Sequence, residues 1–209
     1  MSTMKNISHE LKVHAPFTIF GTLVGVGVMV AVVHSKMPRS VSETLFEIMH
    51  PAHVLLSAAV TAGLYRLYTK GTLWKTFVIG YVGSVGVATL SDCIIPYVGE
   101  LLLNLPHSHH HIGFIDLWWL VNPLALLGIV IACVRPKTKY PHAGHVLLST
   151  AASLFHVTMA LGDEVGVLTM VLIAVFLFLA VWVPCCTSDI VFPLLFARGR
   201  AESVPHHHG

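Results

Sequence analysis

Six long apolar stretches run through the chain, and they constrain its fold more than any other feature. They cover residues 14–34, 45–65, 76–104, 113–134, 143–162 and 165–196. A helix needs about 20 mainly apolar residues to cross the hydrocarbon core of a bilayer, so each stretch is long enough. We therefore expect an all-α integral membrane protein with six transmembrane helices, short linkers and no separate soluble domain.

The charge content agrees with a membrane protein. Charged residues make up only 11% of the 209 residues, whereas soluble domains carry about 25%. The net charge is only +2, without a dense basic stripe, which argues against a nucleic-acid partner. We expect the lipid bilayer as the main partner and a multi-pass location in the plasma membrane of a prokaryote.

Basic residues predict the orientation of the six helices, because cytoplasmic loops are enriched in Lys and Arg. With both termini in the cytoplasm, ten of the twelve Lys and Arg residues fall on the cytoplasmic side. Only Lys36 and Arg39 fall outside. We therefore expect cytoplasmic N- and C-termini.

A sequence repeat divides the chain into two halves. The string HxxHVLLS occurs at residues 50–57 and 142–149, and SDxxxP occurs at 91–96 and 188–193. Each copy holds three apolar stretches, and an odd number of spans turns the second copy upside down in the membrane. We expect residues 1–106 and 107–200 to form two inverted three-helix repeats (3+3). Residues 201–209, with three histidines, are expected to be a disordered tail or the remnant of a tag.

The repeated polar residues predict a metal site. The two histidines of each HxxH pair are three residues apart, so on a helix both imidazoles share one face. Imidazole suits transition metals, and a carboxylate inside an apolar stretch is a functional candidate by default. We expect a divalent transition-metal ion as the bound species. The predicted metal ligands are His50, His53, Asp92, His142, His145 and Asp189.

Each aspartate of the repeat is followed by a proline four residues later. Proline lacks an N–H, so Pro96 is expected to free the carbonyl of Asp92 and Pro193 that of Asp189. Ser91 and Ser188 are expected to orient these groups through hydrogen bonds. The two sets can form two stations along one path or converge on one binuclear site. A competing interpretation is that Asp and His only pair with each other to hold the repeats together.

Several polar residues lie outside the repeat. His156 has no counterpart, because Leu64 occupies the matching position, and we expect it as an additional ligand. Glu47, Glu100 and Asp116 lie near span ends, where they can line an outer vestibule. An outer loop carries a histidine tract that is expected to capture ions or, alternatively, to be a solvated pH-sensitive loop: His107, His109, His110 and His111.

The four cysteines all lie in apolar stretches without CxxC spacing. We interpret them as small buried hydrophobic residues.

Our leading hypothesis is a transporter of a divalent transition metal of the Zn, Fe, Ni, Co or Mn class. The two repeats would rock to expose the ion alternately, and protons would couple through the same His and Asp side chains. The chain can act alone or as a homodimer. A haem protein is a third hypothesis, but HxxH pairs do not suggest two histidines facing each other at similar depth.

The alternative is an intramembrane metal-dependent enzyme, either a hydrolase or a di-metal oxidoreductase. The string GHVLLS at residues 144–149, followed by a later aspartate, resembles the opening of the integral-membrane metal-dependent hydrolases. This chain lacks their Pro-Asp-x-Asp-His continuation. The catalytic residues of that family are therefore not carried over to this chain.

Overall fold

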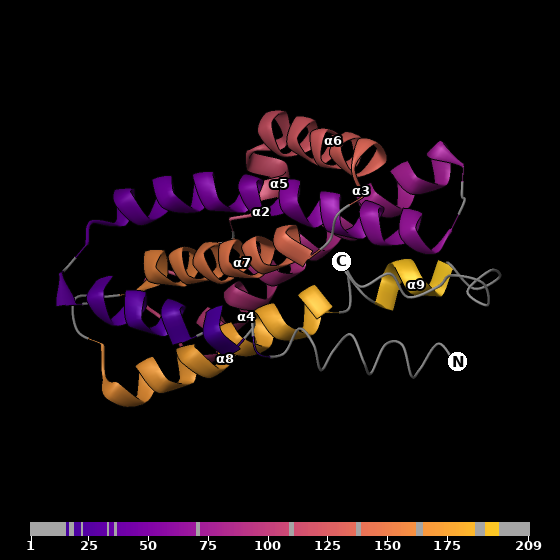
Figure 1. Cartoon of the computed structure of the whole chain (residues 1–209). Coiled ribbons are helices and arrows are strands. Elements are labelled where there is room, and N and C mark those ends of the chain that lie inside the picture. Colours follow the sequence, from indigo (N-terminus) through magenta and orange to yellow (C-terminus); the bar gives the residue numbers. More distant parts are fainter. Residues whose placement is uncertain are drawn as a thin grey trace.

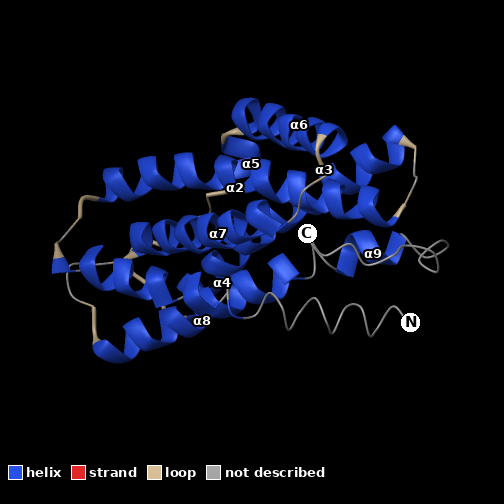
Figure 2. Cartoon of the chain, viewed as in Figure 1, coloured by secondary structure: helices blue, strands red, loops and turns tan. Residues whose placement is uncertain are grey.

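The computed structural model describes residues 16, 19–21, 23–32, 34–35, 37–69, 72–108, 111–136, 139–161, 165–186 and 191–196. For residues 139–143 and 186 it describes the backbone alone. This part of the chain is helical and contains no strand (Figure 2). The all-α fold class is therefore confirmed for the described residues.

In the part of the chain that the structure describes, nine elements follow one another, and Figure 1 labels the α-helices among them. The elements are α2 (Arg39–Tyr68), α3 (Leu73–Thr89), the π-helical segment η1 (Leu90–Ile94), α4 (Ile95–Leu102), α5 (Gly113–Asp116), α6 (Trp118–Val134), α7 (Lys139–Ala160), α8 (Val167–Cys186) and α9 (Phe192–Phe196). The described residues between 19 and 32 are helical as well.

Among the described residues, three helical segments are long and apolar enough to cross a membrane. They are Arg39–Tyr68 with 30 residues, Leu73–Leu102 with 30 and Val167–Cys185 with 19. The stretch 113–134, expected as one helix, is broken instead. The helix α5 ends at Asp116 and α6 starts at Trp118, because Leu117 leaves the helical region with φ −115° and ψ 28°.

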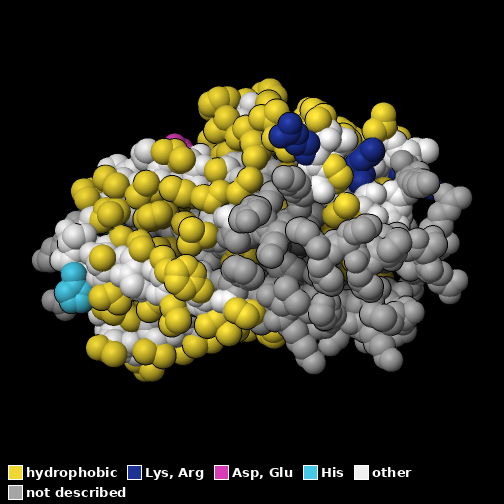
Figure 3. Space-filling view, viewed as in Figure 1, with side chains coloured by type: hydrophobic (Ala, Val, Ile, Leu, Met, Phe, Trp, Pro, Cys, Tyr) yellow, Lys and Arg dark blue, Asp and Glu magenta, His cyan; other side chains and the backbone are white. Residues whose placement is uncertain are grey.

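The described surface is largely apolar, and the interior holds many polar side chains beside its hydrophobic core. On the face drawn in Figure 3, hydrophobic side chains cover most of the described surface, and few charged groups lie among them. Large apolar residues such as Leu102, Trp118 and Val167 are more than half exposed. By contrast, the buried residues include many polar ones: Ser42, His50, His53, Ser57, Thr61, Thr76, Ser84, Ser91, Asp92, Glu100, His145, Ser149, Thr150, Ser153, His156 and Thr158. This is the distribution expected when lipid, rather than water, covers the surface.

The two helices that carry HxxHVLLS pack against each other. α7 lies between α2 and α8 (Figure 1) and contacts both. The ring of His145 contacts that of His53, and Thr158 donates a hydrogen bond to Ser42 near the start of α2. α2 and α7 are therefore antiparallel, with the two copies of the motif at their crossing.

α6 packs on the other side of α2 through a close backbone approach. A Cβ atom at Gly128 would lie 2.3 Å from the carbonyl oxygen of Leu55 and 2.9 Å from the Cβ of Ala58. Only glycine fits there, as is common where membrane helices approach closely. This contact fixes α2 between α6 and α7.

Candidate metal centre

Asp92 organises the buried polar centre of the molecule. It lies in the π-helical segment η1 and is fully buried. The Nδ1 atoms of His50 and His53, both on α2, lie 2.9 Å and 2.6 Å from Asp92 Oδ2. The three residues that the first copy of the repeat predicts as one set therefore come together.

The other oxygen of Asp92 is held by hydroxyl groups. Ser91 Oγ donates to Asp92 Oδ1 at 2.6 Å, and Ser149 Oγ donates to the same oxygen at 3.0 Å. Asp92 thus accepts four hydrogen bonds, which is about the capacity of a carboxylate. In this arrangement Asp92 orients the histidines instead of offering an oxygen to an ion.

These hydrogen bonds fix which nitrogen of each imidazole is available. A carboxylate only accepts, so the Nδ1 atoms of His50 and His53 donate, and in a neutral imidazole the lone pair is then on Nε2. Neither Nε2 has a hydrogen-bond partner among the described residues. Carboxylate–histidine pairs of this kind present imidazole to metals in many metalloproteins.

The ligand atoms of three buried residues lie within 4.8 Å of one another: His53 on α2, His145 on α7 and Cys185 on α8. The rings of His53 and His145 are 4.8 Å apart between centroids, at an interplanar angle of 72°. All three residues are at most 1% exposed. Two imidazoles and a thiolate form a donor set typical of zinc and other borderline or soft ions.

Cys185 is the ligand candidate that the sequence analysis interpreted as a buried hydrophobe. It lies outside the repeated motifs, so repetition could not identify it. Its Sγ lies 3.5 Å from Ser149 Oγ, which in turn bonds Asp92. A signal did exist, since Cys185 comes four residues before Asp189 in the same apolar stretch.

His50 is shielded from the cluster of His53, His145 and Cys185. A Cβ atom at Gly113 would lie 2.6 Å from His50 Nε2, so the backbone of α5 covers that nitrogen. On its other side the ring stacks on Phe46, with centroids 5.3 Å apart. His50 therefore contributes to the centre through its bond to Asp92.

The π-helical turn changes which carbonyl the proline leaves unpaired. In an α-helix the missing N–H of Pro96 would free the carbonyl of Asp92, but π-helical bonds run from i to i+5. The unpaired carbonyl is then that of Ser91, and it accepts a hydrogen bond from Ser153 Oγ at 3.0 Å. The free carbonyl therefore belongs to Ser91, one residue before Asp92, where the sequence predicted it.

The second copy of the motif is only partly described. His145 and Ser149 lie at the centre, as given above. Asp189 and Ser188 lie outside the described residues, as do His109 and His110 of the outer loop, and for His142 only the backbone is described.

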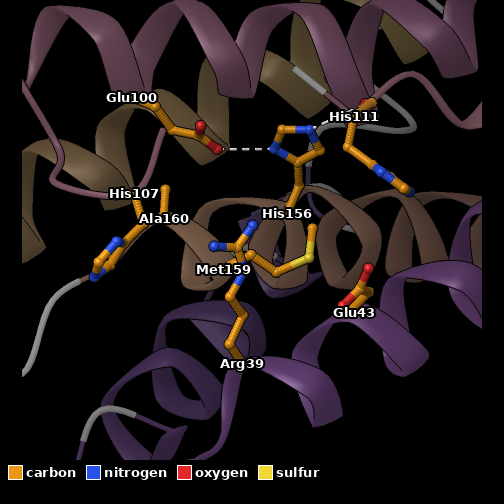
Figure 4. Close-up of a pocket in the computed structure, with 8 residues that line it drawn as sticks. All are labelled: Arg39, Glu43, Glu100, His107, His111, His156, Met159 and Ala160. Carbon is orange, nitrogen blue, oxygen red and sulfur yellow. Dashed lines mark hydrogen bonds and ion pairs between the residues drawn. The ribbon is translucent and has the colours of Figure 1, made fainter. Parts of the chain in front are cut away.

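A second group of polar residues lines a pocket near the α4–α5 loop (Figure 4). Its space is about 270 Å³, part of it open to solvent. It is lined by Arg39, Glu43, Glu100, His107, His111, His156, Met159 and Ala160. The vestibule residue Glu100 and the non-repeated His156 therefore meet at one site, and two loop histidines join them.

His156 is not placed to bind a metal here. Its Nδ1 lies 2.8 Å from Glu100 Oε1, and its Nε2 lies 3.2 Å from the carbonyl oxygen of His111. Both ring nitrogens are therefore engaged. His111 also lies 3.3 Å from Asp116, and burial of His111 lowers its pKa below the ordinary value despite that neighbouring carboxylate.

The chain matches no protein-family model, no curated protein and no solved structure in the comparisons with known proteins.

Proposed function

We propose that the protein is a membrane transporter of a divalent transition-metal ion, with His53, His145 and Cys185 as its binding site. The observation that carries the proposal is that His53 and His145 occupy the same position in the two copies of HxxHVLLS and meet in one buried cluster. A site built by two repeats at their crossing is the arrangement of many secondary transporters.

The inverted 3+3 architecture with six spans is part of this proposal. Matching residues of two copies contact each other only near the axis that relates the copies, and His53 and His145 do so. The antiparallel pairing of α2 and α7 is also what inversion requires. By the same symmetry we propose that Asp189, with Ser188, serves His142 and His145 as Asp92 serves His50 and His53.

The donor set narrows the class of ion. Thiolate and imidazole favour zinc and similar ions over hard ions such as manganese, which prefer oxygen ligands. Both Cys and His must lose a proton to bind, so ion binding releases protons and weakens at low pH. Proton coupling is therefore a natural property of this site.

The test is zinc binding and zinc flux with matched variants. We expect wild type to bind one zinc ion per chain and to carry zinc into proteoliposomes. Cys185→Ser and His145→Ala should each lower the affinity on the order of 100-fold, because each removes one of only three ligands. Cys133→Ser is the control, since Cys133 lies on α6 outside the cluster.

Equal zinc affinity in Cys185→Ser and Cys133→Ser would reject this site. Normal binding without flux in wild type would reject transport and favour the metal-dependent enzyme as the second candidate. That candidate is supported by one observation: three protein donors leave the fourth position of a tetrahedral ion open to water. Metal-dependent hydrolysis by the purified protein, lost in Cys185→Ser, would then be the readout.

A further inference from the structure

A buried carboxylate–imidazole pair joins α4 to α7 at some distance from the metal centre. Glu100 and His156 are each about 1% exposed, and their polar atoms are 2.8 Å apart. Glu100 Oε2 has no hydrogen-bond partner among the described residues. A carboxylate oxygen that is buried without a partner is costly, so it calls for a ligand.

The hydrogen bonds of His156 determine how many protons the pair holds. The carbonyl of His111 can only accept, so His156 Nε2 must carry a hydrogen. The short contact between Nδ1 and Glu100 Oε1 then needs one more proton between the two atoms, bound to either of them. Without that proton a lone pair would face a carboxylate, and the contact would be repulsive.

We propose that Glu100 and His156 form a proton-binding site that latches α4 to α7. With the shared proton in place, the pair is closed as in the structure. When a water molecule in the pocket takes the proton and becomes hydronium, the carboxylate and the imidazole repel each other and the two helices separate there. The reverse step returns the proton to the pair and releases water.

The surroundings favour a proton over a metal ion as the ligand. Arg39 lines the pocket from α2 together with Glu43, and both point toward it in Figure 4. From the α4–α5 segment His107 and His111 also line the pocket. The positive charge of Arg39 disfavours a second divalent cation, while the pocket that Glu100 lines has room for water.

A line of buried polar side chains runs along α7 from this pair to the metal centre. His145, Ser149, Ser153 and His156 are spaced by four, four and three residues, so they share one face of the helix. All four are at most 1% exposed. Eleven residues of α-helix span about 16 Å, and this is the distance over which the latch would act on the metal cluster. Coupling of the latch to metal movement depends on the proposed function, but the latch itself does not.

The test measures amide hydrogen exchange of residues 95–105 against pH in the full-length protein, corrected for intrinsic exchange. We expect wild type to lose protection at least about tenfold at alkaline pH, because a charge-assisted hydrogen bond is lost. Glu100→Gln keeps the shape but removes the shared proton, so its protection should not change with pH. Glu43→Gln, in the same pocket but exposed, should behave as wild type.

Identical pH curves for wild type and Glu100→Gln would overturn the proposal. If Glu100→Gln does not fold, His156→Gln replaces it, with the same expected result. Zinc affinity is measured on the same samples, and Glu100→Gln should stay within about threefold of wild type because Glu100 touches no metal donor. Loss of zinc binding in every sample, wild type included, would reject the metal site and leave the latch to be judged by exchange alone.

Discussion

Asp92 and Glu100 lie eight residues apart on one continuous helical run, and both are buried beside a histidine, yet their surroundings differ. Asp92 accepts four hydrogen bonds. Glu100 shares one hydrogen bond with His156 and keeps an oxygen without a partner among the described residues, at a pocket. A carboxylate surrounded by donors keeps its charge and its position. A carboxylate with a spare oxygen beside water can exchange a proton.

The largest expected difference comes from neutralising each carboxylate in turn. In Asp92→Asn an amide N–H₂ faces donors that need an acceptor, so we expect a loss of about 3–5 kcal/mol in the free energy of unfolding. Glu100→Gln should cost less than about 1 kcal/mol, because its amide can donate to His156. Denaturant titration in micelles measures both, and Asp116→Asn, an exposed carboxylate, is the control. Equal losses in the two variants would contradict the comparison.

Gly113 of α5 packs against His50, which bonds Asp92, and a substitution there tests how rigid the surroundings of Asp92 are. In Gly113→Ala the new methyl group would lie 2.3 Å from His50 Cδ2, so either the ring or α5 must move. We expect a cost of about 1–3 kcal/mol and a weaker metal affinity. Gly86→Ala is the matched control, because a Cβ there meets no atom within 4 Å. Stability unchanged in both variants would show that the cover is not needed.

The hydroxyl groups on Asp92 should matter mostly for metal affinity. Ser149→Ala removes one donor to Asp92 Oδ1 and a neighbour of Cys185. We expect about 1 kcal/mol of lost stability and a 10- to 100-fold weaker zinc affinity, as for other partners of metal-binding groups. Zinc competition with a chelating dye measures this change. Ser108→Ala, in the loop after α4, should leave the affinity unchanged.

The smallest effect concerns His111 at the pocket. Burial holds the pKa of its imidazole below the ordinary value of 6.5, so the folded state binds the proton less readily than the unfolded chain. The contribution of the neutral His111 side chain to stability is fully present above about pH 6.5, and it is lost as the pH falls through the lowered pKa. His111→Gln should therefore reduce acid destabilisation slightly, by less than about 0.5 kcal/mol, because the side chain is only partly buried at the edge of the pocket. Melting curves at pH 5 and pH 7 make the comparison.

The sequence predicted the helical fold and the grouping of His50, His53 and Asp92, because the period of a helix and an intramembrane aspartate are local signals. The contact between His53 and His145 could be expected only from the repeat. The sequence left open whether the two sets form two stations along one path or one binuclear site. The contact of Cys185 with the two histidines and the contact between Glu100 and His156 could not be predicted, since they depend on how α4, α7 and α8 pack. That packing depends on close approaches such as the one at Gly99 of α4, where a Cβ atom would lie 3.1 Å from Phe176 of α8, and no local pattern encodes it.

The π-helical turn at Leu90–Ile94 has a consequence for the direction in which the two acids point. Eight residues of regular α-helix would place Glu100 about 80° around the axis from Asp92. The wider turn reduces this angle, so both acids contact the same helix, α7. Asp92 does so through Ser149, and Glu100 does so through His156. The one extra residue in the π-helical turn therefore brings the two acids to the same side of the helix. Deleting a single residue within this turn would rotate one acid away from α7 while leaving every side chain of the chemistry present.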